Sequence, residues 1–443
     1  MAARERFGLW TLTFLVIASM VGAGVFTTSG FTLQELGTPR LVVAAWVVGG
    51  LIALAGAVSY GQLARAMPES GGEYLFLARA AHPLLGFIAG WVSLIAGFTG
   101  AIAFAATALE GYILPEGVRP SWLPTDSLAV AVVILVGVCH GLRPRGGAML
   151  QNAAVILKLG VLAVFLGLAA YKLPSNTWHG GPLTDVTSST WSLVAAFATS
   201  LVWIALSYSG FNAAVYVIDE AKSPTKSVPK ALLIGTITTM ALYVLLNAVF
   251  VYAPPPTSIA GMPDVAAIAA EWLGGKPVSL FVRVIIALAL LTSVSSMVMA
   301  APRVYAKMAD DGLLPRFLRS HDGAPRYAIA AQVLFAIVII RVSTLHGLLS
   351  YLGLTLSLCA ACSVGCLFLP SVRRKPFLHV SHLPPLIYIT CTLAAAGIMT
   401  THNPTHLIGT VLTVSVGALV YAAVPGKRSS KTNSLPKTQS RRE

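Results

Sequence analysis

The sequence predicts an all-α protein that crosses a membrane many times, and three observations support this. Of its 443 residues, 56% are hydrophobic and only 10% are charged, whereas a soluble chain carries about 25% charged residues. The mean hydropathy is +0.78, which means more apolar surface than a soluble protein can bury. The apolar residues form continuous runs of about 20, the length of a membrane-spanning helix. A membrane β-barrel would need shorter segments of alternating hydrophobicity instead.

These runs predict twelve membrane-spanning helices. The ninth and tenth are separated only by Ser343 and Thr344. After the twelfth, the basic and Ser/Thr-rich residues 427–443 predict a disordered cytoplasmic tail. The expected spans are residues 8–31, 40–66, 84–113, 126–141, 148–171, 190–220, 230–252, 278–306, 327–342, 345–369, 385–401 and 405–424.

The lysines and arginines predict the orientation of the chain. With the N-terminus in the cytoplasm, 23 of the 30 basic residues fall in cytoplasmic loops or in the tail, as the positive-inside rule requires. We therefore expect a multi-pass protein of the inner (plasma) membrane, embedded in the lipid bilayer with both termini cytoplasmic. The net charge of +14 is divided among short clusters between apolar runs, so it does not indicate a nucleic-acid partner. No cleavable signal peptide is expected.

Two spans are interrupted by small residues near their middle. The first contains Val21-Gly22-Ala23-Gly24-Val25-Phe26, and the sixth contains Ser207-Tyr208-Ser209-Gly210-Phe211-Asn212. Such interruptions at corresponding positions of two halves are typical of transporters with inverted repeats and broken helices. Close helix packing at glycines is the alternative. We expect five-helix repeats at residues 1–172 and 190–370, and then helices eleven and twelve within 371–426.

These motifs resemble those of the amino acid–polyamine–organocation (APC) superfamily of permeases, which have the LeuT fold. Residues 21–26 are similar to its Gly-Ser-Gly-Ile/Val-Phe signature, with Ala23 in place of the usual serine. Residues 68–74, 207–212, 219–230 and 309–315 resemble other family motifs, whereas spans eleven and twelve carry none. The resemblance implies a LeuT-type 5+5 inverted repeat with helices 1 and 6 broken. The chain is closest in character to L-type and bacterial neutral amino-acid transporters.

A broken helix can bind both charged groups of an amino acid without charged side chains. We expect the backbone N–H groups of Gly22, Ala23 and Gly24 to bind the carboxylate. Carbonyl groups near Ser19, Met20, Leu206, Tyr208 and Ser209 would accept hydrogen bonds from the ammonium, beside Gly210. By resemblance, Leu206 stands where relatives often place an aromatic gate, and Asn212 borders the pocket. On span three, we expect Ala96, Gly97, Gly100 and Phe104 to form part of the wall.

Lys158 is an ionisable residue in the middle of span five, which by default suggests a function. Snorkelling to the surface is the alternative, but Lys158 is about ten residues, or ~15 Å, from the start of the helix. By resemblance to APC relatives, it takes the place of a sodium ion that joins spans one and eight. Its ammonium group would then contact the carbonyls of Ala18 and Val21 and the hydroxyls of Ser293 or Ser296.

The predicted function is sodium-independent, proton-coupled transport of neutral L-amino acids by alternating access. Obligate amino-acid exchange is the first alternative, and a membrane sensor built on a transporter scaffold is the second. No catalytic constellation is visible, so an enzyme is not expected. We predict no cofactor and no metal, because the Cys359-x-x-Cys362 pair has no second pair or histidine partner at zinc spacing and is interpreted as small core residues. Of the acidic residues, only Glu110 falls well inside a span, nearer the external side.

Overall fold

The computed structural model describes residues 7–115, 117–142, 147–172, 178–183, 189–310, 314, 318, 326–373, 376 and 379–423. Within its helices, the side chains of residues 142, 147–158, 161, 300, 303–304, 306–308 and 310 are not described. The predicted tail at 427–443 therefore lies outside the described residues, as does the side chain of Lys158.

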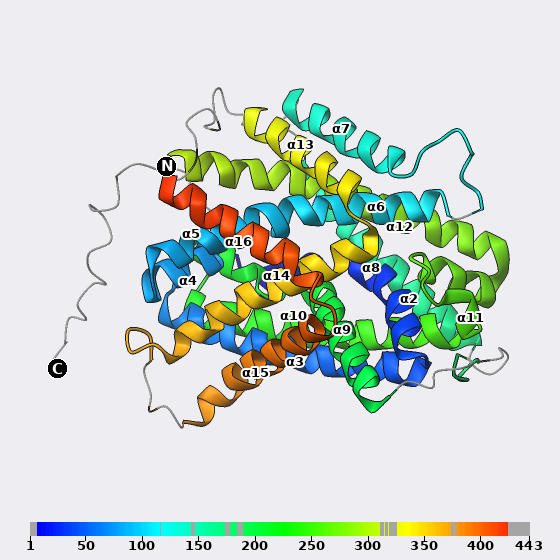
Figure 1. Cartoon of the computed structure of the whole chain (residues 1–443), viewed down its shortest axis with the longest axis horizontal. Helices are drawn as coiled ribbons and strands as arrows, with labels where there is room; N and C mark the ends of the chain where they lie inside the picture. The colour runs from blue at the N-terminus through cyan, green and yellow to red at the C-terminus, as the bar shows by residue number, and fades with distance from the viewer. Residues whose placement is uncertain are drawn as a thin grey trace.

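The described residues fold into helices joined by short connections, and the long helices run across the molecule in both directions (Figure 1). We call its two ends the α4 side, at the left of Figure 1, and the α11 side, at the right. The α-helices are α1 Leu9–Met20, α2 Gly24–Leu36, α3 Pro39–Ala66, α4 Gly72–Ala80, α5 Pro83–Val92, α6 Ala101–Ile113, α7 Ser127–Leu142, α8 Gly147–Lys172, α9 Thr190–Tyr208, α10 Pro224–Tyr252, α11 Pro256–Ile259, α12 Val265–Asp310, α13 Arg326–Val342, α14 Leu345–Gly365, α15 Leu383–His402 and α16 His406–Ala423.

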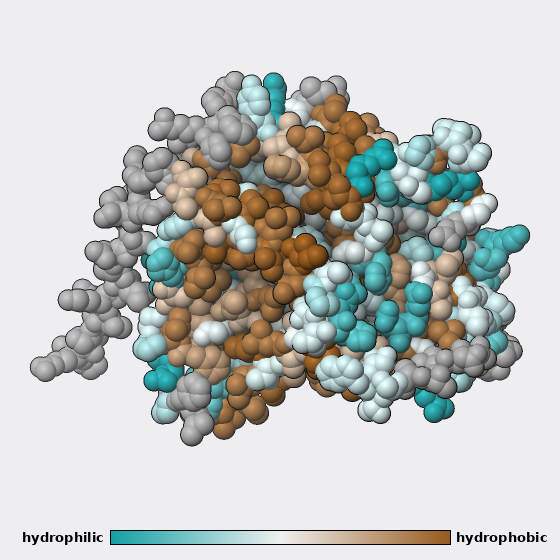
Figure 2. Space-filling model, viewed as in Figure 1, coloured by the Kyte–Doolittle hydropathy of each residue, from teal (hydrophilic) through white to brown (hydrophobic). Residues whose placement is uncertain are grey.

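The length and hydropathy of these helices fit a protein that crosses a membrane many times. Among the described residues, eight helices are long and apolar enough to span it, or nine if the bent pair of α1 and α2 is one span. The other three predicted spans coincide with α7, α8 and α13. Figure 2 shows hydrophobic side chains over the middle of one face, with hydrophilic ones gathered at the α11 side. The count of twelve and the 5+5 arrangement stay predictions.

The first span is broken where the sequence predicts it. Helix α1 ends at Met20, helix α2 begins at Gly24, and the two are bent by 44°. The residues between them have no continuous helical hydrogen bonding. Carbonyl groups at the end of α1 and N–H groups at the start of α2 therefore lack partners within the helices.

The sixth span is also broken where the sequence predicts it. Helix α9 ends at Tyr208, and Ser209 and Gly210 have the non-helical angles ψ 147° and φ 100°. The span continues as a 3-10 helix, η2, over Ala213–Glu220, in which Val217 departs from helical angles. A 3-10 segment in the middle of a helical span often marks a hinge.

The two breaks lie directly against each other. A Cβ atom at Gly24 would lie 2.8 Å from the Cα of Ser207, and one at Gly210 would lie 2.7 Å from the carbonyl oxygen of Ser19. The hydroxyls of Thr28 and Ser207 share a hydrogen bond of 2.9 Å. Glycine at these two positions therefore lets the two broken helices approach each other at backbone distance.

Candidate functional site

A cavity of about 570 Å³ lies at the two breaks and extends from them toward the α4 side. Its walls come from α1, α3, α4, α6, α9, α12, α14 and α15, from the breaks in spans one and six, from η2, and from a π-helical stretch, η1 (Ser93–Gly100), in span three. Most of the lining side chains are small, apolar or hydroxylated. Those on the broken spans and α12 are Leu15, Ala18, Ser19, Val21, Gly22, Leu201, Val202, Ala205, Leu206, Tyr208, Ser209, Gly210, Phe211, Asn212, Ala213, Tyr216, Val217, Thr292, Ser293, Ser296 and Met297.

Most of the predicted site residues line this cavity. The structure brings together Ser19, Gly22, Leu206, Tyr208, Ser209, Gly210 and Asn212, with the predicted coupling residues Ala18, Val21, Ser293 and Ser296. Met20, Ala23 and Gly24 are not among its lining residues. Gly24 instead packs on the backbone at Ser207, as described above, so α2 begins just behind the cavity wall.

Two of the carbonyl groups predicted to bind an ammonium already accept hydrogen bonds. The carbonyl of Met20 accepts one from the hydroxyl of Tyr243 at 2.6 Å. The carbonyl of Leu206 accepts one from the N–H of Ser209 at 3.0 Å. A carbonyl oxygen has two lone pairs, so the bond to Leu206 leaves one for a ligand.

Span three presents a different face to the cavity from the one expected. Ser93, Gly97, Phe98 and Ala101 line it. Of the expected wall, only Gly97 does; Ala96, Gly100 and Phe104 are not lining residues. The physical reason is the π-helix η1, where the hydroxyl of Thr99 reaches the carbonyl five residues back, on Leu94, at 2.9 Å. The wider turn rotates the following residues relative to an α-helix.

Glu73 is a cavity residue that the sequence analysis did not identify. It lies in the first turn of α4, and only 6% of its surface is exposed. Its Oε1 accepts hydrogen bonds from the hydroxyl of Tyr60 at 2.8 Å and from the side-chain amide of Asn212 at 2.5 Å. Its Oε2 accepts one from the hydroxyl of Tyr216 at 2.5 Å. Glu73 lies in the connection between the predicted spans 40–66 and 84–113, so a search for acidic residues inside the spans did not find it.

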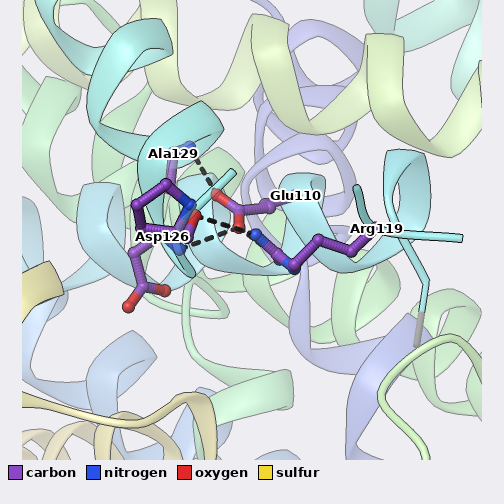
Figure 3. Close-up of polar contacts among 5 residues, drawn as sticks. Glu110, Arg119, Asp126 and Ala129 are labelled. Carbon is purple, nitrogen blue, oxygen red and sulfur yellow. Dashed lines mark hydrogen bonds and ion pairs between the residues drawn. The ribbon is translucent and has the colours of Figure 1, made fainter. Parts of the chain in front are cut away.

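Glu110 has a structural position away from the cavity. It is buried on α6, and its carboxylate is paired with Arg119 and accepts hydrogen bonds from the backbone N–H groups of Asp126 and Ala129, each at 2.8 Å (Figure 3). Those two N–H groups lie at the start of α7, where a negative charge is favourable. Glu110 is not a lining residue of the cavity.

On the α11 side of the breaks, side chains fill the space between the helices. Helix α2 is buried along its length except at Gln34 and Glu35. The ring of His346 on α14 meets Trp203 on α9 and Phe31 on α2 edge to face, with centroid distances of 4.8 and 5.4 Å. The indole N–H of Trp203 also donates to the hydroxyl of Ser350 at 2.8 Å. Phe31, Trp203 and His346 are not lining residues of the cavity, so this packed cluster lies outside it.

The predicted coupling site is described only in part. Helix α8, which carries Lys158, packs against α12, but the side chain of Lys158 lies outside the described residues. On α12, the hydroxyls of Ser293 and Ser296 donate to the carbonyls of Ala289 and Thr292 at 3.0 and 2.8 Å. Each hydroxyl keeps lone pairs that can accept a hydrogen bond from an ammonium group or bind a cation.

The cysteines do not behave as one set of core residues. Cys366 is buried, whereas Cys139 and Cys362 are exposed, because their helices present them outward. The expectation of a core position is therefore wrong for Cys362. Cys359 and Cys391 line the cavity. Cys391 shares α15 with the further lining residues Tyr388, Thr392 and Ala395, so a span without a recognisable motif also contributes to the wall.

A cavity at two broken helices in an apolar, many-helix protein defines a membrane transporter. Comparison with known proteins gives the family: the model of the amino acid permease family matches residues 7–436, and the chain belongs to that family. It is 24% identical over 410 residues to the large neutral amino acids transporter small subunit 2 of Mus musculus, covering 88% of this chain and 75% of the relative. It is 25% identical over 409 residues to the mouse Asc-type amino acid transporter 1, with the same coverage.

A third relative matches a shorter part of the chain. This is the b(0,+)-type amino acid transporter 1 of Mus musculus, 24% identical over 266 residues, which cover 58% of this chain and 53% of the relative. The family and these relatives are transporters rather than enzymes.

Proposed function

We propose that the chain carries neutral L-amino acids across the plasma membrane by alternating access, without sodium and coupled to protons. The observation that carries this proposal is the cavity at the two breaks, which is lined by Ser19, Gly22 and Ser209. One relative is named as a large neutral amino acids transporter, and another as an Asc-type amino acid transporter.

The side chains around the cavity support a neutral substrate. Among the described residues that line the cavity, Glu73 is the one with a charged side chain, and its carboxylate already accepts three hydrogen bonds. A cationic substrate side chain would have to compete with these donors. An anionic side chain finds no arginine or lysine among the lining residues whose side chains the structure describes, and a buried charge without a partner costs several kcal/mol.

The sidedness of the cavity follows from the proposed orientation. The positive-inside rule puts the first residues of α1, and with them α4, in the cytoplasm. A cavity that extends toward the α4 side is then an inward-facing one. The packed rings of Phe31, Trp203 and His346 would be the closed external side.

Lys158 is the residue proposed to replace sodium and to couple transport to protons. Its helix packs on α12, and the proposed partners Ala18, Val21, Ser293 and Ser296 all line the cavity. A lysine ammonium at this place would join α1 to α12 as a bound cation does. Binding and release of a proton by the Lys158 side chain would make this connection between α1 and α12 depend on the proton gradient.

Uptake of a labelled neutral amino acid into proteoliposomes tests the proposal. We expect uptake without sodium and faster uptake with an imposed inward proton gradient. Uptake that requires unlabelled amino acid inside the vesicles, and ignores the proton gradient, would instead identify an obligate exchanger. Binding of the amino acid without any uptake would favour a sensor.

A further inference from the structure

The segment that contains Glu73 is bonded to both ends of η2. At the start of η2, Glu73 accepts hydrogen bonds from Asn212 and Tyr216, each at 2.5 Å. At its end, the N–H of Ser70 donates to the carboxylate of Asp219 at 3.3 Å, and the N–H of Asp219 donates to the hydroxyl of Ser70 at 3.0 Å. Four hydrogen bonds thus join this connection to the second half of span six.

The backbone next to Glu73 is shaped to hold the ring of Tyr216. A Cβ atom at Gly72 would lie 2.3 Å from Cε1 of Tyr216, and Gly72 has a φ of 57°. No side chain could occupy that position without displacing the ring. The ring therefore rests on the bare backbone of Gly72, while its hydroxyl reaches the carboxylate of the next residue.

Glu73 also connects η2 to the rest of the protein. Its third hydrogen bond comes from the hydroxyl of Tyr60 on α3 at 2.8 Å. The ring of Tyr60 in turn meets Phe211, in the break of span six, with a centroid distance of 5.4 Å. One carboxylate therefore links α4, α3 and span six.

The element held in this way needs support from outside. It is a 3-10 helix whose Val217 departs from helical angles, and hydrogen-bond geometry in 3-10 helices is poorer than in α-helices. Its residues Ala213, Tyr216 and Val217 line the cavity. Helix η2 is therefore part of the cavity wall.

We propose that Glu73 is a positioning residue that latches η2 in the arrangement in which the cavity faces the α4 side. This inference rests on the proposed alternating access. When the latch is broken, η2 loses its hold on α4 and α3, and the balance shifts toward the arrangement that is closed on that side. Loss of one hydrogen bond to a charged group changes an equilibrium by about tenfold or more.

The accessibility of Cys391 measures this balance. In a variant with the other four cysteines replaced by serine, Cys391 is the single thiol that lines the cavity. A membrane-impermeant thiol reagent is added separately to whole cells and to inverted membrane vesicles. A control shows in which preparation the α4 side faces the reagent. In this control, the exposed Glu69 is replaced by cysteine in a chain without other cysteines, and the preparation that is labelled is the one sought.

Breaking the latch should slow the labelling of Cys391 from the α4 side and speed it from the α11 side. For E73A and for Y216F, we expect the rate from the α4 side to fall about twofold or more, because a tenfold shift moves a 10:1 population to about 1:1. The matched control is E69Q. Glu69 lies on the same connection but pairs with Arg79. In the E69Q variant, Cys391 should therefore be labelled at the parental rates.

Two results would overturn the latch. One is labelling of both E73A and Y216F at the parental rates from both sides. The other is a parent chain in which Cys391 is labelled only from the α11 side. If E73A does not fold, the labelling rates of Cys391 in Y216F test the proposal, because this substitution removes only one hydroxyl group. The labelling needs no substrate, so its outcome is independent of whether the chain takes up neutral amino acids.

Discussion

A methyl group added at Gly24 should push the two broken spans apart. The Cβ atom of G24A would lie 2.8 Å from the Cα and 2.9 Å from the Cβ of Ser207, whereas two carbon atoms pack at about 3.5 Å. Because one of these neighbours is backbone, a change of rotamer cannot relieve the overlap. Helices α2 and α9 would have to separate by about 0.7 Å at this point.

The cost of that separation is measurable. Overpacking of a tightly packed interior costs about 1–3 kcal/mol, and the hydrogen bond between Thr28 and Ser207 would be weakened as well. We expect G24A to lower the thermal unfolding temperature of the detergent-purified protein. Its affinity for a neutral amino acid, measured by calorimetry, should also fall, because Ser209 and Gly210 follow α9 directly.

Gly22 provides the matched control for this experiment. A Cβ atom there meets only the carbonyl oxygen of Met20, at 3.8 Å, and Gly22 lines the cavity. We expect G22A to unfold at the wild-type temperature while binding the amino acid more weakly. If G24A is as stable as the wild type and binds the substrate equally well, the argument from the close contact at Ser207 is wrong.

Three further predictions concern coupling, specificity and stability. K158A should abolish stimulation of uptake by a proton gradient more than it weakens binding, whereas K172A at the end of α8 should leave both unchanged; normal stimulation in K158A would exclude the coupling role. In competition for uptake of a labelled neutral amino acid, alanine, serine and leucine should compete better than arginine or glutamate; the reverse order would mean that the cavity accepts a charged side chain. E110Q should lower the thermal unfolding temperature, because it weakens the buried pair with Arg119 and the bonds to the start of α7, but should keep the wild-type order of substrates; an altered order would place Glu110 in the site.

The sequence alone predicted the parts of this protein that depend on local chemistry. Continuous apolar runs predicted apolar helices, because a membrane excludes unpaired backbone groups. The glycines near residues 22–24 and Gly210 predicted the two breaks, because small residues tolerate an unwound backbone and a close neighbour. Those breaks then predicted several of the residues from the two spans that line the cavity, among them Ser19, Gly22 and Ser209.

Only the tertiary structure decided which side chains meet. The π-helix in span three changes the lining face from that of a regular helix, and this change of turn is not visible in the sequence. Glu73 appears in the sequence as one acid in a polar connection between spans. Its burial depends on donors from Tyr60, Asn212 and Tyr216, which lie up to 143 positions away in the chain. Long-range packing of this kind follows from how the helices assemble, so the local pattern of residues could not determine it.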